Sequence, residues 1–477
     1  MKQLLSISCE ILKSYPKADL QAIEKALQSE FKQFDRKIIV LDDDPTGTQT
    51  VHGISVFTDW NHNSLTEGFQ EENSMFYILT NSRGMTSAQT EQIHREIVKV
   101  LEQVSKELNR PYILVSRSDS TLRGHYPLET ETLRKAIEKN GRSIDAEVLA
   151  PFFLAGGRYT LNNIHYVQEG EQLTPAGQTE FARDKSFGFK SSHLGEWCEE
   201  KTGGAFKAES VTFITLEEIR ACDYTGIYNK LMKVKNFNKI VVNAIADSDM
   251  KVFVTALLKV LKSGKEIIFR TAAGFPQILG GITDKPLLVK EELVPPGNRN
   301  GGIILIGSHV NKTTQQMNAL LQSDLPIKPI EFNQHRVLEE NGLENEVERV
   351  LTRAEDFIRQ GQNVVIYTRR DRFDLDTDDK DAQLAVSVRI SDAVTSIIGR
   401  LRIRPNFVIA KGGITSSDVA TKALRVKKAL VLGQILPGVP VWKTGSESTF
   451  PDLPYVIFPG NVGSVDALRD AVTTLCV

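Results

Sequence analysis

Short apolar segments rich in Val and Ile alternate with longer segments of helical periodicity along most of this chain. In residues 87–108, for example, Ile93, Ile97, Val100, Leu101 and Val104 recur at helical spacing and form one apolar face. Parallel strands need a long crossover connection, which is usually a helix. The alternation therefore predicts an α/β fold with largely parallel sheets. The expected strands are 37–41, 54–58, 75–80, 112–116, 147–150, 211–215, 239–244, 266–270, 303–306, 364–367 and 407–410.

A stretch rich in Pro, Gly and Asn at residues 294–302 interrupts the alternation. Proline stops a helix and glycine frees the backbone, so this stretch is typical of a linker. A length of 477 residues is enough for two or three domains. We therefore predict two α/β domains, residues 1–297 and 298–477, with a ligand cleft between them.

The overall charge gives no sign of a polyanionic partner. Lys and Arg total 58 against 60 acidic residues, a formal net charge of -2, which argues against a nucleic-acid or membrane-surface partner. The four cysteines are scattered without metal-binding spacing, as expected of reduced thiols. The chain start lacks signal-peptide features, and no apolar run approaches the roughly 18 residues of a membrane span. We expect a cytoplasmic protein.

Three consecutive acids, Asp42, Asp43 and Asp44, directly follow the first predicted strand and precede a Pro-Thr-Gly turn. The carboxyl ends of strands form the edge at which open α/β sheets bind their ligands. Like charges this close repel, so a metal, an arginine or a polyhydroxylated ligand is expected to relieve the repulsion. A solvated acidic turn is the simpler alternative. We interpret the three acids as catalytic candidates, with Asp119 as a rival.

Further polar turns follow neighbouring strands of the first half. They offer hydroxyl groups, glycine backbone and arginine side chains, and an arginine fork matches a carboxylate or phosphate in bidentate geometry. Each arginine taken singly is better explained by a surface ion pair. Their joint position after strands of one sheet favours a site for a small, anionic, polyhydroxylated molecule. The candidate binding residues are Arg83, Ser118, Ser120, Arg123, Gly157 and Arg158.

The second half carries three glycine turns, two after predicted strands and one before the predicted final helix. Glycines at a strand-to-helix turn expose backbone N–H groups beside the positive end of the helix dipole, where phosphate binds well. None of the turns fits the P-loop or the dinucleotide fingerprint. Lys411 is either a cation that neutralises phosphate or a surface lysine. The candidate nucleotide-binding residues are Ser308, Lys411, Gly412, Gly413, Ile414, Thr415, Gly460 and Gly463.

The sequence leaves the metal ligands unassigned. The acidic run 371–381 is either a solvated loop or a contributor to a Mg²⁺ site. No His/Cys cluster has the spacing of a structural zinc site.

Together these motifs resemble the four-carbon acid sugar kinase family, which includes 3-oxo-tetronate, D-threonate and D-erythronate kinases. The resemblance covers residues 37–477. It implies an N-terminal domain that binds a sugar acid, a C-terminal domain that binds ATP, and transfer of phosphate to a hydroxyl with Mg²⁺ as cofactor. The sugar acid and ATP are the implied partners, and a homo-oligomer is possible. The motifs that carry it are DDDPTG at 42–47, SDSTLRG at 118–124, Gly157-Arg158 with Thr160, Gly307-Ser308, Gly412-Gly413 with Thr415-Ser416, and the turn 460–463.

The chain departs from the family pattern at three places. Ile414 stands where the family carries an acidic or similar polar residue, and the turn 458–463 replaces a Lys-Ser-Gly-x-Phe-Gly pattern. The segments 173–182 and 187–192 also differ, as in a distinct branch. These departures bear on the substrate more than on the chemistry.

Two other functions remain open. Asp42-x-Asp44-x-Thr46 fits the DxDxT motif of haloacid-dehalogenase-type phosphatases, with Asp42 as nucleophile and Asp44 as acid and base. That interpretation leaves the glycine turns unexplained. A non-enzymatic sugar-acid-binding protein would need neither those turns nor the clustered acids. The kinase is the favoured prediction.

Overall fold

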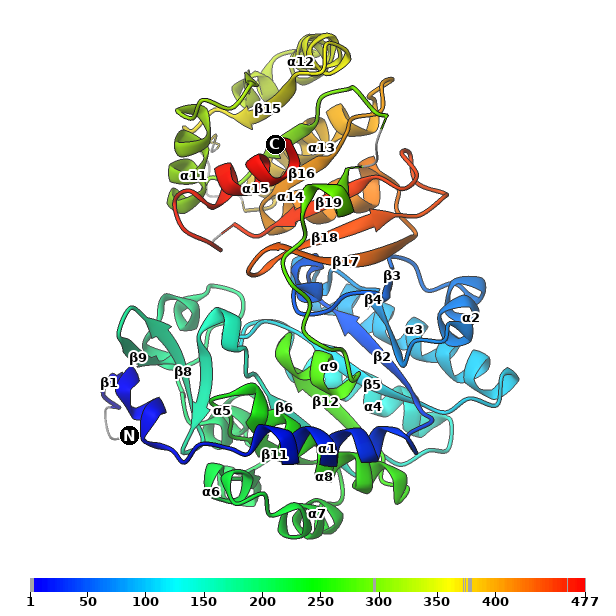
Figure 1. The fold of residues 1–477 in the computed structure, drawn as a ribbon. Helices are drawn as coiled ribbons and strands as arrows, with labels where there is room; N and C mark the ends of the chain where they lie inside the picture. The colour runs from blue at the N-terminus through cyan, green and yellow to red at the C-terminus, as the bar shows by residue number, and fades with distance from the viewer. Residues whose placement is uncertain are drawn as a thin grey trace. The chain divides into compact units, whose positions relative to one another are not determined.

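The computed structural model describes residues 4–294, 297–371, 373, 375, 380–460 and 462–476. The chain forms two compact units (Figure 1). The first comprises Met1–Gly47 and Asp59–Asp284, and the second comprises Thr48–Thr58 and Lys285–Val477. Each unit has its own mostly parallel strands with helices beside them, so the predicted α/β fold is confirmed.

The sheet of the first unit is parallel between all of its neighbouring strands. Its central strands are buried along their whole length, which explains why they read as continuous apolar runs instead of alternating patterns. In spatial order the strands are β10 (Thr212–Ile214), β11 (Asn238–Val242), β6 (Ala146–Ala150), β12 (Ile267–Thr271), β5 (Tyr112–Arg117), β2 (Lys37–Asp42) and β4 (Met75–Leu79).

Two groups of helices flank this sheet (Figure 1). The first group is α2 (His62–Gln70), α3 (Ser87–Glu107) and α4 (Leu128–Lys139). The second group is α1 (Leu20–Phe31), α6 (Leu216–Arg220), α7 (Tyr224–Lys233), α8 (Asp247–Lys262) and α9 (Gly274–Leu279). The start of α3 is sharply defined because Thr86 and Gln89 form a capping box, each side chain bonding to the other's backbone.

A small antiparallel sheet was not predicted from the sequence. It lies in the Gly- and Thr-rich region after β6 and is followed by α5 (Leu194–Lys201). Its strands are β1 (Ile7–Ser8), β9 (Gln172–Pro175), β8 (Ile164–Glu169) and β7 (Arg158–Leu161), in spatial order.

The second unit combines a parallel part and an antiparallel part. The neighbouring pairs β19–β16, β16–β13, β13–β15 and β15–β14 are parallel. The pairs β3–β17, β17–β18 and β18–β19 are antiparallel. In spatial order the strands are β3 (Ser55–Phe57), β17 (Lys428–Leu436), β18 (Val439–Thr444), β19 (Pro454–Phe458), β16 (Val408–Lys411), β13 (Ile303–Ile306), β15 (Asn363–Thr368) and β14 (Ile327–Phe332).

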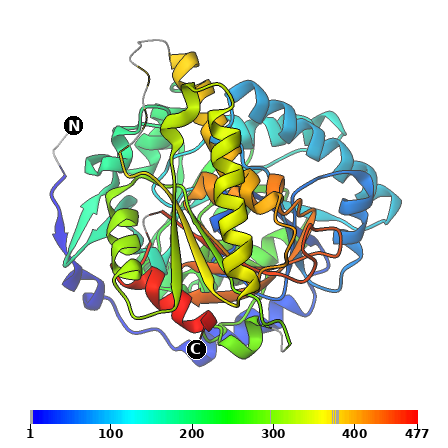
Figure 2. The ribbon, with the colours of Figure 1, turned by 90° about the horizontal axis from the view of Figure 1, so that it is seen from above.

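Helices cover the parallel part of this sheet. In Figure 2, α12 (Gly342–Arg359), drawn in yellow-green, runs beside β14 and β15. The other helices are α10 (Lys290–Leu293), α11 (Asn311–Leu321), α13 (Lys380–Gly399), α14 (Gly413–Asp418) and α15 (Ala467–Cys476). No helix in the described ranges is long and apolar enough to cross a membrane.

The units differ from the predicted division at residue 297. Residues 48–58 belong to the second unit, where β3 pairs with β17 and the Trp442 indole donates to Thr48 Oγ1 at 2.9 Å. The later boundary falls at Asp284/Lys285, because Leu288 and Leu293 join the core of the second unit. Two prolines of the predicted linker, 295 and 296, lie outside the described residues.

Candidate functional site

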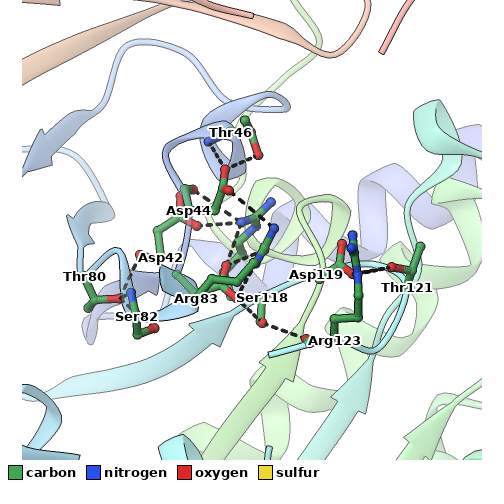
Figure 3. Close-up of polar contacts among 12 residues, drawn as sticks. Asp42, Asp44, Thr46, Thr80, Ser82, Arg83, Ser118, Asp119, Thr121 and Arg123 are labelled. Carbon is green, nitrogen blue, oxygen red and sulfur yellow. Dashed lines mark hydrogen bonds and ion pairs between the residues drawn. The ribbon is translucent and has the colours of Figure 1, made fainter. Parts of the chain in front are cut away.

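The three consecutive acids lie at the carboxyl end of β2, which runs between β5 and β4 in the first unit. The turns after β4 and β5 therefore bring Arg83 and Arg117 to the same edge (Figure 3 shows Arg83 beside the acids). Asp42 and Asp43 are 1% and 3% exposed. Carboxylates buried this deeply require cationic or hydrogen-bonding partners, so they are not a solvated turn.

Asp43 has donors on both carboxylate oxygens. Arg83 binds it in bidentate fashion, with Nη2 2.6 Å from Oδ1 and Nε 3.1 Å from Oδ2. Arg117 Nη1 lies 3.2 Å from Oδ1, and the Ser118 hydroxyl donates to Oδ2. Arginine thus relieves the repulsion among the acids, which is one of the three possibilities expected from the sequence. With both oxygens engaged, Asp43 is suited to fix the two arginines in position.

Asp42 is the acid with an unsatisfied oxygen. Its Oδ1 accepts from Arg117 Nη1 at 2.8 Å, but Oδ2 is buried and finds no partner among the described residues. Burial, with the neighbouring charges of Asp43 and Asp44, raises the pKa of Asp42 to about 7 despite Arg117. A Cβ at Gly47 would lie 2.2 Å from both oxygens, so only glycine fits against this carboxylate.

Asp44 is the most accessible acid, with a side chain 16% exposed. Its Oδ1 accepts from Thr46 Oγ1 at 2.6 Å and from Thr46 N at 2.9 Å. Its Oδ2 has one long contact, 3.4 Å from Arg83 Nη1. Burial alone would raise the pKa of Asp44, but Arg83 and the Thr46 bonds outweigh it and lower the pKa. Asp44 is therefore an ionised acceptor with capacity left at Oδ2.

Asp119 lies in a second polar cluster, with Arg123 (Figure 3). Arg123 Nε donates to Asp119 Oδ2 at 2.7 Å, and Thr121 donates to the same oxygen. Burial would raise the pKa of Asp119, yet Arg83 and Arg123 hold it well below the usual range. Arg123 also lies over the Phe181 ring, 4.9 Å from its centroid. Both members of the pair already have partners.

Arg158, Gly157 and Ser120 lie near the same cluster. Arg158 lies 5.8 Å from the Phe181 centroid, and its buried Nε has no acceptor among the described residues. Burial lowers the pKa of Arg158. Gly157 has φ 69°, a left-handed conformation that favours glycine. The carbonyl of Ser120 accepts from His165 Nε2 at 2.8 Å.

The candidate site residues did not include two arginines of this edge, although Arg117 stands in one of the polar turns that the sequence indicated. Arg117 binds Asp42 and Asp43, and Arg270, at the end of β12, donates to the Arg123 carbonyl at 2.8 Å. Both side chains are buried, at 4% and 6% exposure. A signal existed in the sequence, since a charged residue at the end of an otherwise apolar strand is costly to bury without a partner.

The glycine turns of the second unit converge at one edge of its sheet. They follow β13, β16 and β19, which are adjacent and parallel. Thr313 Oγ1 links two of the turns by contacting Ser308 Oγ at 3.3 Å and donating to the Gly460 carbonyl at 3.0 Å. Gly412 has φ 121°, and a Cβ there would lie 3.1 Å from that of Ser308. The three predicted turns are thus brought together.

Lys411, Ile414 and Gly463 differ strongly in exposure. Lys411 is fully buried, and Nζ donates to the carbonyls of Pro459 at 2.5 Å and Gly460 at 3.3 Å. Burial, with the charge of Lys312, lowers the pKa of Lys411 to about 7. The surface-lysine alternative is therefore wrong. Ile414 is 74% exposed, and Gly463 is exposed with φ 83°.

Arg370 joins this edge and was missed in the sequence. It follows β15, the neighbour of β13, and Nη2 donates to the Ser308 carbonyl at 2.7 Å and to Thr314 Oγ1 at 2.8 Å. Its Nη1 is buried and has no acceptor within the described ranges. Burial lowers the pKa of Arg370, with no carboxylate acting against it. A partly buried arginine without a counter-ion is suited to an anionic ligand.

The described residues contain no group of three or more His, Cys, Asp or Glu that could hold a metal ion. Most of the acidic run 371–381, the predicted contributor to a Mg²⁺ site, lies outside the described residues.

Comparisons with known proteins also identify two domains in the chain. Residues 38–279 match the family described as "Sugar-binding N-terminal domain", and residues 303–468 match "Nucleotide-binding C-terminal domain". Together the matches cover most of the chain. No curated protein matches the sequence.

Two solved structures share the fold. Haemophilus influenzae protein HI1011, of a domain family of unknown function (DUF1537), has 16% identity and a TM-score of 0.59, covering 92% of this chain and 100% of its own. A Salmonella typhimurium LT2 protein, provisionally named a tRNA synthase, has 16% identity and a TM-score of 0.64, covering 91% of this chain and 98% of its own. At this identity the likeness concerns the fold.

Proposed function

Because the chain belongs to the family defined by a sugar-binding N-terminal and a nucleotide-binding C-terminal domain, we propose that it is an ATP-dependent kinase of a small, four-carbon-like sugar acid. The observation that carries the proposal is that each unit holds one of two chemically complementary sheet edges. A cluster of acids and arginines lies at the carboxyl ends of strands in the first unit. Glycine turns, together with Lys411 and Arg370, lie at the carboxyl ends of strands in the second unit. Phosphoryl transfer needs a hydroxyl-orienting acid and cationic phosphate contacts.

On the sugar-acid side, Asp44 accepts the proton of the reacting hydroxyl. It is the accessible acid of the three, and its Oδ2 has room for a further donor. Asp42 and Asp43 hold Arg83 and Arg117 in place beneath it. Asp119 remains the second candidate for the acceptor. The residues that bind the rest of the substrate are Arg83, Ser118, Ser120, Arg123, Gly157 and Arg158.

On the nucleotide side, backbone N–H groups of the turn 412–415 and of the turn containing Gly460 and Gly463 bind the phosphates of ATP. Ser308 adds a hydroxyl, and Lys411 and Arg370 add positive charge. Ile414, exposed at the start of α14, offers the nucleotide an apolar contact in addition to its N–H group. Mg²⁺ would neutralise charge on the transferred phosphate.

The phosphatase alternative is less consistent with the site. Its nucleophile would be Asp42, which must reach the phosphorus atom of the substrate. The Asp42 side chain is 1% exposed and lies against Gly47 and Arg117. A sugar-acid-binding protein without catalysis leaves the nucleotide-binding match without a role.

The direct test measures ADP formation by the full-length protein with ATP, Mg²⁺ and a panel of tetronates, 3-oxo-tetronates and related acids. We expect one or a few acids to raise the ADP rate far above the rate with ATP alone. The product should carry phosphate on a hydroxyl, which mass spectrometry and ³¹P NMR would identify. Phosphate release from phosphorylated acids in the absence of ATP would instead support the phosphatase.

Nucleotide binding is expected to take up protons above pH 7. With its pKa lowered to about 7, the buried Lys411 is largely neutral at pH 8. A bound phosphate favours the charged form and raises that pKa, so a proton is taken up and affinity falls as pH rises from 7 to 9. Titration calorimetry of ADP in buffers of different ionisation enthalpy measures the uptake.

The matched control is Lys411→Met, which should bind ADP more weakly and remove most of the uptake. Uptake that is the same in the variant and the unmodified protein would place the titrating group elsewhere.

A further inference from the structure

A cavity of about 440 Å³ in the first unit adjoins the acid cluster. Arg83, which binds Asp43 and approaches Asp44, forms part of its wall. Gly124 forms another part, and a Cβ there would lie 3.3 Å from Asp43 Oδ2. Of the residues predicted to bind the sugar acid, Arg83 alone is in the lining. The volume is in the range of small-molecule sites.

The lining of this cavity is cationic. It includes Arg83, His125 and Lys201, and none of its residues is acidic. Lys201 Nζ donates to the Gly188 carbonyl at 3.3 Å and forms no ion pair with a carboxylate in the part of the chain that the structure describes. Burial lowers the pKa of Lys201 and outweighs the nearby Glu200, which raises it, while Arg270 adds to the lowering. A cation held in this way is stabilised by an anionic ligand.

The first turn of α3 adds to the positive potential. Thr86 and Ser87 line the cavity at the start of this 21-residue helix. The first N–H groups of a helix have no partner within the helix, and they carry the positive end of its dipole. Thr86 Oγ1 caps the N–H of Gln89, whereas no bond within the described residues engages the N–H of Ser87.

The opposite wall is a preformed loop. The side chain of Asp184 accepts from the N–H groups of Ser186 at 2.8 Å and Phe187 at 3.0 Å. Phe187 packs edge-on against His125, with ring centroids 4.9 Å apart. Asp184 also lies 3.7 Å from Arg123 Nη1. This loop, residues 184–188, overlaps the start of the segment 187–192, where the sequence departs from the family pattern.

We propose that this cavity binds the carboxylate end of the substrate, with Lys201 as its cationic contact and His125 beside it, while the reacting hydroxyl lies toward Asp44. The inference rests on the proposed sugar-acid kinase and deepens it. Arg123 is engaged by Asp119 and Asp184, so it is not the main carboxylate partner. The loop 184–188 then selects among acids by their length and by the groups near the carboxylate.

The test compares Lys201→Met with Lys201→Arg in the full-length protein. The methionine variant should raise KM for the sugar acid about 10- to 100-fold, as expected for loss of a charge-assisted hydrogen bond. It should leave the affinity for ATP and KM for the matching polyol, which lacks the carboxylate, unchanged. Arginine restores the charge and should return KM for the acid to within a few-fold of the original.

Lys190→Met is the matched control, because Lys190 is an exposed lysine of the preceding segment 187–192 and lies outside the cavity lining. It should leave KM for the acid unchanged. A Lys201→Met variant with normal melting temperature and an unchanged KM would overturn the subsite while the kinase stands.

Calorimetry with sugar acids in the absence of nucleotide tests the carboxylate subsite separately from the proposed kinase function. Sugar acids that bind in a Lys201-dependent way but never stimulate ADP formation would support the subsite and refute the kinase. Binding that is equal in Lys201→Met and the unmodified protein, or no binding of any tested acid at millimolar concentration, would overturn the subsite.

Discussion

Replacing Asp44 by Asn should lower kcat by a factor of about 10²–10⁴, the range for loss of a group that transfers a proton. The carboxylate that accepts the proton of the reacting hydroxyl is lost, whereas the shape of the side chain is kept. The affinity for ATP should stay the same, because Asp44 belongs to the first unit and the phosphate-binding turns to the second. The measurements are kcat by coupled ADP detection and Kd for ATP by calorimetry.

The variant Asp43→Asn should be measured beside Asp44→Asn. Asp43 is buried with Arg83, Arg117 and Ser118, so its loss leaves buried charge uncompensated. Breaking a buried pair in this way costs about 3–5 kcal/mol of folding free energy. Asp43→Asn should therefore lower both kcat and the melting temperature, whereas Asp44→Asn should lower kcat alone. Full activity in Asp44→Asn would transfer the acceptor role to Asp42 or Asp119.

Replacing Arg370 by Met should weaken the binding of ATP and ADP by a factor of about 10–100, the effect of losing a charge-assisted hydrogen bond to phosphate. Arg370 is partly buried next to Ser308, and its buried Nη1 has no acceptor among the described residues. A partly buried guanidinium without a counter-ion gains from binding an anion. Titration calorimetry with ADP measures the loss directly.

The adjacent Arg369 provides the control. Its side chain pairs with Asp371 at 3.0 Å and is 38% exposed, so Arg369→Met removes the same charge from a solvated position. That variant should keep nearly full ADP affinity. Equal losses in the two variants would indicate a general electrostatic effect and would falsify a specific phosphate contact by Arg370.

Kinetics of Arg370→Met should locate the phosphate that it contacts. If the contact is to the transferred phosphate, kcat should fall more than the affinity for ADP, because the charge on that phosphate is stabilised during transfer. If the contact is to the phosphates that remain on ADP, affinity for ATP and ADP should fall together with little change in kcat.

Local patterns in the sequence predicted the parallel parts of the fold. The strand expected at 303–306 coincides with β13, and the helix expected at 87–108 is α3, Ser87–Glu107. These elements could be predicted because periodicity and capping act over a few residues. The small sheet of β7–β9 and the hairpin of β17 and β18 were missed. The β7–β8, β8–β9 and β17–β18 pairs join strands that are close in the sequence, whereas β1–β9 and β3–β17 join distant segments. Strand propensity depends on packing against neighbouring strands, which weakens local signals.

The unit to which residues 48–58 belong also could not be predicted from local sequence patterns. Their sequence identifies a strand but not its unit, because the pairing of β3 with β17 joins segments almost four hundred residues apart. The linker-like composition at 294–302 favoured a simple division of the chain. Only the folded structure shows that Leu288 and Leu293, before that stretch, pack in the core of the second unit.

The sequence by itself determined where chemistry-bearing residues occur: acids and polar turns after strands of the first half, and glycine turns after strands of the second. Tertiary structure decided their partners and their charge states. Arg117 with Asp42, Arg270 with the Arg123 carbonyl and Arg370 with Ser308 all join different strands or turns of a sheet. The pKa values of Asp42 and Lys411, both about 7, follow from burial. Burial is a property of the packed chain, since desolvation depends on every neighbour that excludes water.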